Sequence, residues 1–157
     1  MRVWRIASQS LAYSAKDLSG AGAKITGGRW NSVGIPVLYC AENPSLACLE
    51  TLVHLGTSDL PLQRYLIAID IPDRIWRARV IVETELLPTN WNISPPNKSS
   101  IDFGNAWIKS EKSVVMSLPS VIVPEDSIFL INPMHKDVSL INAVVMRKWE
   151  YDVRLFS

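Results

Sequence analysis

The sequence has little cysteine and no long apolar run, and each shortage excludes a class of protein. Only two of the 157 residues are cysteine. Cys40 and Cys48 form no CxxC pair, so we expect two reduced thiols that behave as small hydrophobic side chains. No segment approaches the roughly 20 apolar residues that a membrane-spanning helix needs, and the N-terminus lacks the apolar core of a signal peptide. We therefore expect a cytoplasmic protein with no membrane contact.

An excess of charge of either sign is also missing. The 16 basic and 15 acidic residues give a net charge of +1 and are spread along the chain. Direct nucleic-acid binding is not expected, because it needs a basic face that neutralises phosphates. With 48% hydrophobic residues, the chain is long enough for one core and short for two. We expect a single domain over residues 1–157.

Short β-branched and aromatic runs, bounded by Pro, Gly or Asn, predict a fold rich in strands. The predicted strands cover residues 36–41, 64–71, 77–83, 113–119, 127–132 and 141–153. Two helices are predicted, over residues 44–55 and 105–112. Residues 87–100 are rich in Pro, Asn and Ser and indicate a flexible connection. The fold class is therefore mixed α+β.

The first predicted helix carries a carboxylate at the edge of its apolar face. Asn43 suits the N-cap, Pro44 the first helical position and Gly56 the exit. Glu50 borders a wide apolar arc, which helical spacing builds from Leu46, Cys48, Leu49, Leu52, Val53 and Leu55. A partly desolvated carboxylate at such a border suits a functional site, but Glu50 equally suits a solvated position paired with His54.

Two adjacent glycines precede an arginine shortly before this helix. Gly27 and Gly28 allow the backbone to approach a ligand closely, and the Arg29 guanidinium can bind a phosphate or a carboxylate with two parallel hydrogen bonds. The alternative is an ordinary glycine turn followed by a surface arginine.

Two further side chains have both a functional and a structural interpretation. Tyr39 can stack on a planar ring, although an aromatic side chain in a strand commonly belongs to the core. Ser120 lies between two prolines that stiffen the backbone around its hydroxyl, although serine is also a common turn residue.

Four separated segments together resemble the RES domain, the toxin half of a bacterial toxin–antitoxin pair. The segments are GGRWNSVGIPVLYCAENPSLACLE, FGNAWIKS, LPSVIVPEDSIFLINPMH and YDVRL. The resemblance runs from Trp4 to Leu155, with the segments in the family's order. The RES domain is named for an arginine, a glutamate and a serine, and the resemblance places these on Arg29, Glu50 and Ser120.

The resemblance also places the tyrosine of the family pattern on Tyr39. This chain departs from the pattern in the late loop, with Ser127 in place of an asparagine and Lys136 in place of a proline. No role is assigned from the sequence to Ser127, Asn132 or His135 in that loop.

The resemblance implies a fold similar to ADP-ribosyltransferases, with mixed β-sheets and flanking helices, and NAD as the substrate without a metal. Breaking the nicotinamide–ribose bond expels a neutral leaving group, so one carboxylate suffices, unlike the pair in ordinary glycosidases. Glu50 would stabilise the developing charge on the ribose, and Arg29, with Gly28 before it, would bind the pyrophosphate. Tyr39 would stack on the nicotinamide, and Ser120 would orient Glu50 or a ribose hydroxyl.

The resemblance leaves the acceptor of the ADP-ribose open among water, phosphate and a protein side chain. We rank degradation of free NAD, causing growth arrest, before transfer to a protein, since one small domain offers no extra module for a protein target. A non-catalytic binding protein is a further alternative, which the intact site residues disfavour. A thiol hydrolase built on Cys48 and His54 is disfavoured because these side chains point about 120° apart around the helix.

The resemblance further implies a partner. An antitoxin with a helix-turn-helix domain would supply the DNA contacts that this chain lacks. A homodimer of the toxin within such a complex is compatible with the sequence.

Overall fold

The computed structural model describes residues 1–55 and 63–156. Its strands are β1 (Arg2–Ser8), β2 (Leu38–Ala41), β3 (Arg64–Asp70), β4 (Val80–Ile81), β5 (Val115–Pro119), β6 (Ser127–Ile131) and β7 (Asn142–Trp149). Its α-helices are α1 (Ala21–Thr26), α2 (Pro44–Leu52), α3 (Asp73–Arg77) and α4 (Lys98–Ser110). Short 3-10 helices cover Thr84–Leu86, Lys136–Leu140 and Val153–Phe156.

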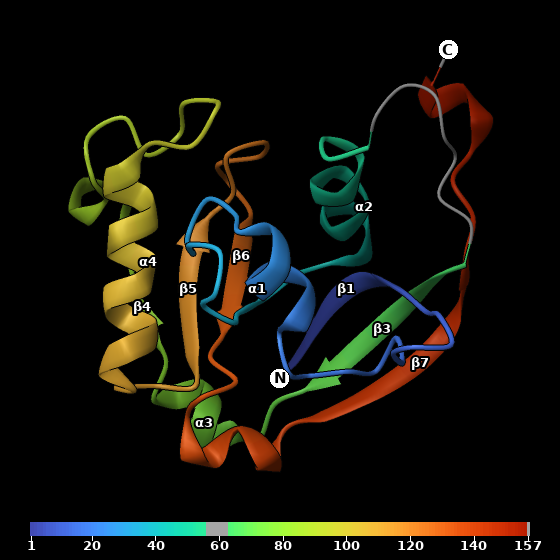
Figure 1. The fold of residues 1–157 in the computed structure, drawn as a ribbon, viewed down its shortest axis with the longest axis horizontal. Coiled ribbons are helices and arrows are strands. Elements are labelled where there is room, and N and C mark those ends of the chain that lie inside the picture. Colours follow the sequence, from blue (N-terminus) through green and yellow to red (C-terminus); the bar gives the residue numbers. More distant parts are fainter. Residues whose placement is uncertain (56–62, 157) are drawn as a thin grey trace.

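In the described part of the chain, one seven-stranded sheet in the order β4-β5-β6-β2-β1-β3-β7 organises the fold. Its pairings are antiparallel, apart from the parallel pair of β4 and β5. Figure 1 shows the sheet twisting, so that β1, β3 and β7 run obliquely to β5 and β6. A mixed sheet with separate helices confirms the predicted α+β class.

Alternation along the strands divides the core between the two faces of the sheet. In β6, Ile128 and Leu130 join one buried cluster, whereas Phe129 and Ile131 join the other. The first cluster also takes side chains from α2 and α4, and the second takes Ile75 from α3. Because strand side chains alternate between faces, α2 and α4 cover one face and α3 the other.

Most predicted strands are present, but the structure corrects their extent. Strands were predicted over residues 77–83 and 141–153, whereas β4 spans only Val80–Ile81 and β7 ends at Trp149. The first part of 77–83 is occupied by the end of α3; neither α3 nor α1 is predicted from the sequence. β1 was also missed, because Arg2 and Arg5 interrupt its apolar pattern. Pairing with β2 and β3 on both sides nevertheless makes it an inner strand.

The predicted helices also change at their ends. α4 begins at Lys98, not near residue 105, because the Asn97 side chain caps it by accepting a hydrogen bond from the Ser100 amide. The last residues of the predicted connection 87–100 are therefore helical. α2 begins at Pro44 as predicted, with Asn43 as its cap, but ends at Leu52. The predicted exit at Gly56 lies outside the described residues.

The apolar arc predicted for α2 is only partly buried. Leu46 and Ala47 are buried, and Cys48, Leu52 and Leu55 pack against the core. Leu49 and Val53, in contrast, are exposed. The apolar arc of α2 therefore extends beyond the side of the helix that packs on the sheet.

No helix within residues 1–55 and 63–156 is both long and apolar enough to cross a membrane.

Candidate active site

Glu50 is positioned by the way α2 sits on the sheet. Asn43 Oδ1 accepts a hydrogen bond of 2.8 Å from the Leu46 amide, which fixes the start of the helix. Leu46 and Ala47 then bury one side of the first turns against the sheet. Glu50, one turn later, lies half-buried at the border of this contact. The carboxylate is therefore carried by a well-anchored helix and remains accessible.

Ser120 fixes the orientation of that carboxylate. Its hydroxyl donates a hydrogen bond of 2.7 Å to Glu50 Oε1, across 70 residues of sequence. The same oxygen accepts from the amides of Ile122 and Val123, at 3.0 and 3.1 Å. Ser120 is fully buried directly after β5. Since a hydroxyl has one hydrogen, these two acceptor contacts direct it to Glu50.

The Arg29 guanidinium interacts electrostatically with the Glu50 carboxylate. Its Nη1 atom donates to the carbonyl oxygens of Trp91 and Ile93, both at 2.7 Å. Burial lowers the pKa of the Arg29 guanidinium below its ordinary value, and the Glu50 carboxylate opposes this shift. The site thus combines a half-buried cation with a carboxylate held in a fixed orientation.

Tyr39 supports the turn that carries Arg29. Its hydroxyl accepts from the Trp30 amide at 3.0 Å and donates to Asn31 Oδ1 at 2.7 Å. Burial raises the pKa of this hydroxyl, so it stays neutral. The phenol oxygen is therefore committed to the turn, and only the half-buried ring is available to a ligand.

Gly28 belongs to the same turn for a steric reason. A Cβ atom at this position would lie 2.6 Å from the Tyr39 hydroxyl oxygen and 3.0 Å from Asn31 Oδ1. The absence of a side chain at position 28 therefore allows Tyr39 to reach the backbone beside Arg29.

Gly28→Ala is expected to destabilise the fold by about 1–3 kcal/mol, because the new methyl group displaces the Tyr39 hydroxyl. Tyr39→Phe removes that oxygen and two hydrogen bonds, which costs about 1–3 kcal/mol on its own. The double variant should lose clearly less stability than the sum of the two, since the clash is then relieved. Urea unfolding of the four proteins measures this, and strict additivity would contradict the proposed steric coupling.

A second support for the Arg29 turn comes from α4 and was missed in the sequence. Asn105 accepts from the Ser32 amide at 3.0 Å and donates to the Ser32 hydroxyl at 2.6 Å. At Gly104 the carbonyl of Trp30 contacts the helix, in space that a Cβ atom would occupy. A glycine inside a helix is unfavourable on its own and is therefore a signal of such a contact. The segment FGNAW thus positions the turn of residues 28–32.

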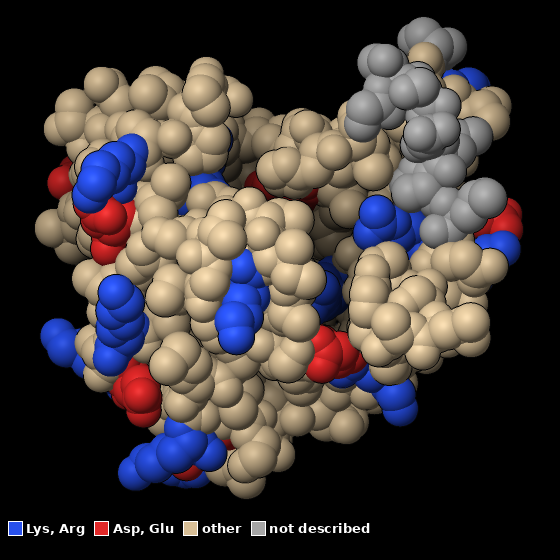
Figure 2. Space-filling view, viewed as in Figure 1, with Lys and Arg blue, Asp and Glu red and all other residues tan. Residues whose placement is uncertain are grey.

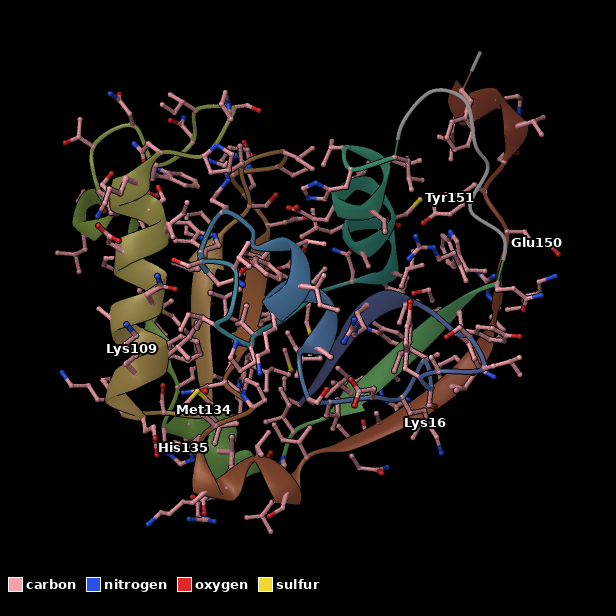
Figure 3. The ribbon with its side chains drawn as sticks, in the orientation of Figure 1. Lys16, Lys109, Met134, His135, Glu150 and Tyr151 are labelled. Carbon is pink, nitrogen blue, oxygen red and sulfur yellow. The ribbon has the colours of Figure 1, made fainter. Side chains whose placement is uncertain are left out.

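The late loop does not join the site. The Ser127 amide donates to Glu42 Oε2 at 2.8 Å, and buried Asn132 donates to the Ile108 carbonyl at 2.8 Å. His135 Nδ1 accepts from the Asp137 amide and caps a 3-10 helix. Figure 3 places His135 beside α3, at the opposite end of the molecule from α2. These contacts give Ser127, Asn132 and His135 structural roles.

The cysteines fit no catalytic arrangement. Both thiols are unpaired, and burial raises the pKa of Cys40 to about 12. Burial also raises the pKa of half-buried Cys48, which disfavours its thiolate, whereas His54 is exposed. The structure therefore gives no support to a thiol hydrolase.

The surface around these elements is hollowed. Figure 2 shows a hollow between the part of the molecule built by α4 and the part built by α2, with basic and acidic atoms inside it. An oriented carboxylate and a half-buried guanidinium suit a ligand that carries both developing positive charge and anionic groups. Among the predicted site residues, Ser120 is hydrogen-bonded to Glu50. Gly28 is part of the turn that carries Arg29, and the Tyr39 hydroxyl contacts this turn.

Comparisons with known proteins identify the family of this chain. The family described as RES domain matches residues 2–154. The chain is 49% identical over 152 residues to the "Prs ADP-ribosylating toxin" of Sphingobium sp. (strain YBL2), covering 97% of this chain and 94% of that protein. It is 35% identical over 156 residues to "Toxin Res" of Yersinia enterocolitica serotype O:8 / biotype 1B, covering 99% of both.

The fold is also similar to one in a crystal structure of the M. tuberculosis MbcT–MbcA toxin–antitoxin complex. The TM-score is 0.67 at 14% identity, over 99% of this chain and 86% of that chain. At this identity the similarity shows the fold alone. The match to residues 2–154, together with the identity to the full-length relatives, shows that the chain belongs to the RES domain family.

Proposed function

We propose that this chain is the toxin of a toxin–antitoxin pair, and that it cleaves the nicotinamide–ribose bond of NAD and transfers ADP-ribose to a cellular protein. The observation that carries the proposal is the Glu50 carboxylate, which the buried Ser120 hydroxyl holds at 2.7 Å while Arg29 lies within electrostatic range. A carboxylate that is already oriented stabilises an oxocarbenium-like ribose without reorganising during the reaction.

Each site residue has a role in this proposal. Glu50 lies at the nicotinamide ribose and stabilises positive charge as nicotinamide leaves. Ser120 keeps the carboxylate in place by donating to Oε1. Arg29 binds the pyrophosphate, and Gly28 permits the turn on which it is carried. The Tyr39 ring, whose hydroxyl is bound to the turn, offers its face to the nicotinamide.

The identity of the acceptor is supported by a relative. The Sphingobium protein, 49% identical over nearly the full length, is named for ADP-ribosylation of Prs. This favours transfer to a protein over degradation of free NAD, which the sequence alone ranks first. Prs is therefore the first acceptor to test. Cleavage of NAD by water or phosphate is a second candidate, because the family resemblance leaves the acceptor open among water, phosphate and a protein side chain.

The two candidates are separated by labelled NAD. The purified chain is incubated with NAD carrying a label in its adenylate part, alone, with phosphate, with lysate and with purified Prs. Transfer to a protein predicts a discrete labelled band and little nicotinamide release without an acceptor. Fast nicotinamide release by the chain alone, with no labelled band, would replace the first candidate with the second.

The proposed partner is an antitoxin with a helix-turn-helix domain. The structurally similar M. tuberculosis protein occurs in a toxin–antitoxin complex. Because the net charge of this chain is only +1, we expect the antitoxin to make the contacts with DNA. Co-expression of the antitoxin should restore growth. If it covers the NAD site, a non-hydrolysable NAD analogue at saturation should weaken its binding by linkage. An unchanged antitoxin affinity would show that neutralisation acts elsewhere.

A further inference from the structure

Arg29 is joined to a turn that lies more than 60 residues later in the chain. Its Nη1 atom donates to the carbonyl oxygens of Trp91 and Ile93, each at 2.7 Å. A terminal guanidinium nitrogen carries two hydrogens, so these two contacts use both of them. The turn around Trp91 and Ile93 therefore occupies one end of the Arg29 side chain.

The turn is itself fixed by an aromatic contact. The Trp91 ring stacks on Trp30, with centroids 6.2 Å apart and planes 25° apart. Trp30 directly follows Arg29, is fully buried, and is also in edge contact with Phe103 of α4. The Trp91 amide donates to the Pro88 carbonyl at 3.1 Å. The position of the Trp91 carbonyl is thus set relative to the residue beside Arg29.

The other edge of the guanidinium is free within the described part of the chain. No hydrogen bond or ion pair from Nε or Nη2 of Arg29 is present among residues 1–55 and 63–156. The guanidinium is planar, so anchoring Nη1 at two carbonyls restricts the plane in which Nε and Nη2 lie. That Nε–Nη2 edge is able to bind two oxygens of a phosphate with parallel hydrogen bonds.

We propose that Trp91 is a positioning residue for NAD: its stacking on Trp30 holds the carbonyls of Trp91 and Ile93 against Nη1, which turns the Nε–Nη2 edge of Arg29 toward the pyrophosphate. This inference rests on the function proposed above. The pyrophosphate is not part of the bond that breaks, so its contacts act alike in the ground state and the transition state. Loss of Trp91 therefore raises KM for NAD and leaves kcat little changed.

A double-mutant cycle with Arg29 tests the positioning role. Trp91→Ala is expected to raise KM for NAD about tenfold, with kcat within about threefold of wild type. Trp91→Phe, which keeps a ring to stack on Trp30, should restore most of the loss. In an Arg29→Ala background, Trp91→Ala should add almost nothing, because the group on which it acts is gone. Leu86→Ala, at an exposed residue earlier in the same segment, is the matched control.

Thermal melts accompany each variant, and Trp91→Leu replaces Trp91→Ala in the cycle if the alanine variant does not fold. An equal rise of KM in the wild-type and Arg29→Ala backgrounds would overturn the positioning role and leave the proposed function intact. A fall in kcat without a change in KM would overturn it as well. If Arg29→Ala itself leaves KM and kcat unchanged, Arg29 does not bind NAD, and the proposed function loses its pyrophosphate contact together with this inference.

Discussion

Replacing Glu50 with Gln is expected to abolish growth arrest while the protein stays folded. Glutamine keeps the shape of the side chain, and its Oε1 atom can still accept the hydrogen bond from Ser120. The substitution removes only the negative charge of Glu50. In the proposed mechanism this charge stabilises the oxocarbenium-like ribose. Nicotinamide release should fall by about 10²-fold or more, the range found when one preorganised electrostatic contact is removed from an active site.

The matched control is Glu150→Gln, which makes the same chemical change on an exposed side chain. This variant should remain as toxic as wild type. Full toxicity of Glu50→Gln, at an equal level of folded protein, would show that the charge of Glu50 does not take part in the reaction. Loss of toxicity in both variants would point to expression rather than to the site.

Replacing Gly104 with Ala is expected to have the largest effect on stability. The new Cβ atom would overlap the carbonyl oxygen of Trp30 and lie 2.6 Å from its carbonyl carbon. Both partners are backbone, so neither can move without shifting α4 or the turn that carries Arg29. Overpacking of this kind costs about 1–3 kcal/mol and occasionally more, which is a large share of the stability of one domain.

Gly22→Ala is the control for the change from glycine to alanine in a helix. Gly22 lies in α1, and a Cβ atom there has no neighbour within 4 Å. Helix propensity then predicts a gain of up to about 1 kcal/mol. Denaturant unfolding of both variants measures the difference. Equal stability of Gly104→Ala and wild type would contradict the tight contact between α4 and Trp30.

The sequence predicts the fold class because its strands are apolar and clearly bounded. The strands in residues 64–71 and 127–132 are buried on both faces of the sheet. Their continuous apolar sequence is therefore enough to predict them as strands. β1 escaped prediction because its arginines hide the apolar pattern, and only pairing on both sides reveals it as an inner strand. The start of α4 was hidden by serines and asparagines that indicate a loop, although Asn97 is a readable cap.

The candidate site depended on the resemblance to a family. Spacing along one helix cannot show that Glu50 meets Ser120, because the two residues lie 70 positions apart and on different elements. The roles of Arg29, Glu50, Ser120, Tyr39 and Gly28 in binding and chemistry stay predictions. Gly104 and Trp91 were missed as supports of Arg29, because their contacts join distant segments and involve main-chain carbonyls that carry no sequence signal.

A crystal structure of the Glu50→Gln variant with NAD tests the central claim most directly. The variant retains the contacts that bind NAD while it slows cleavage, so the intact dinucleotide should be captured. The account predicts the nicotinamide ribose beside residue 50, the nicotinamide against the Tyr39 ring, and pyrophosphate oxygens within hydrogen-bond distance of Nε and Nη2 of Arg29. NAD bound away from Glu50, or beside Glu50 with its pyrophosphate away from Arg29, would contradict it.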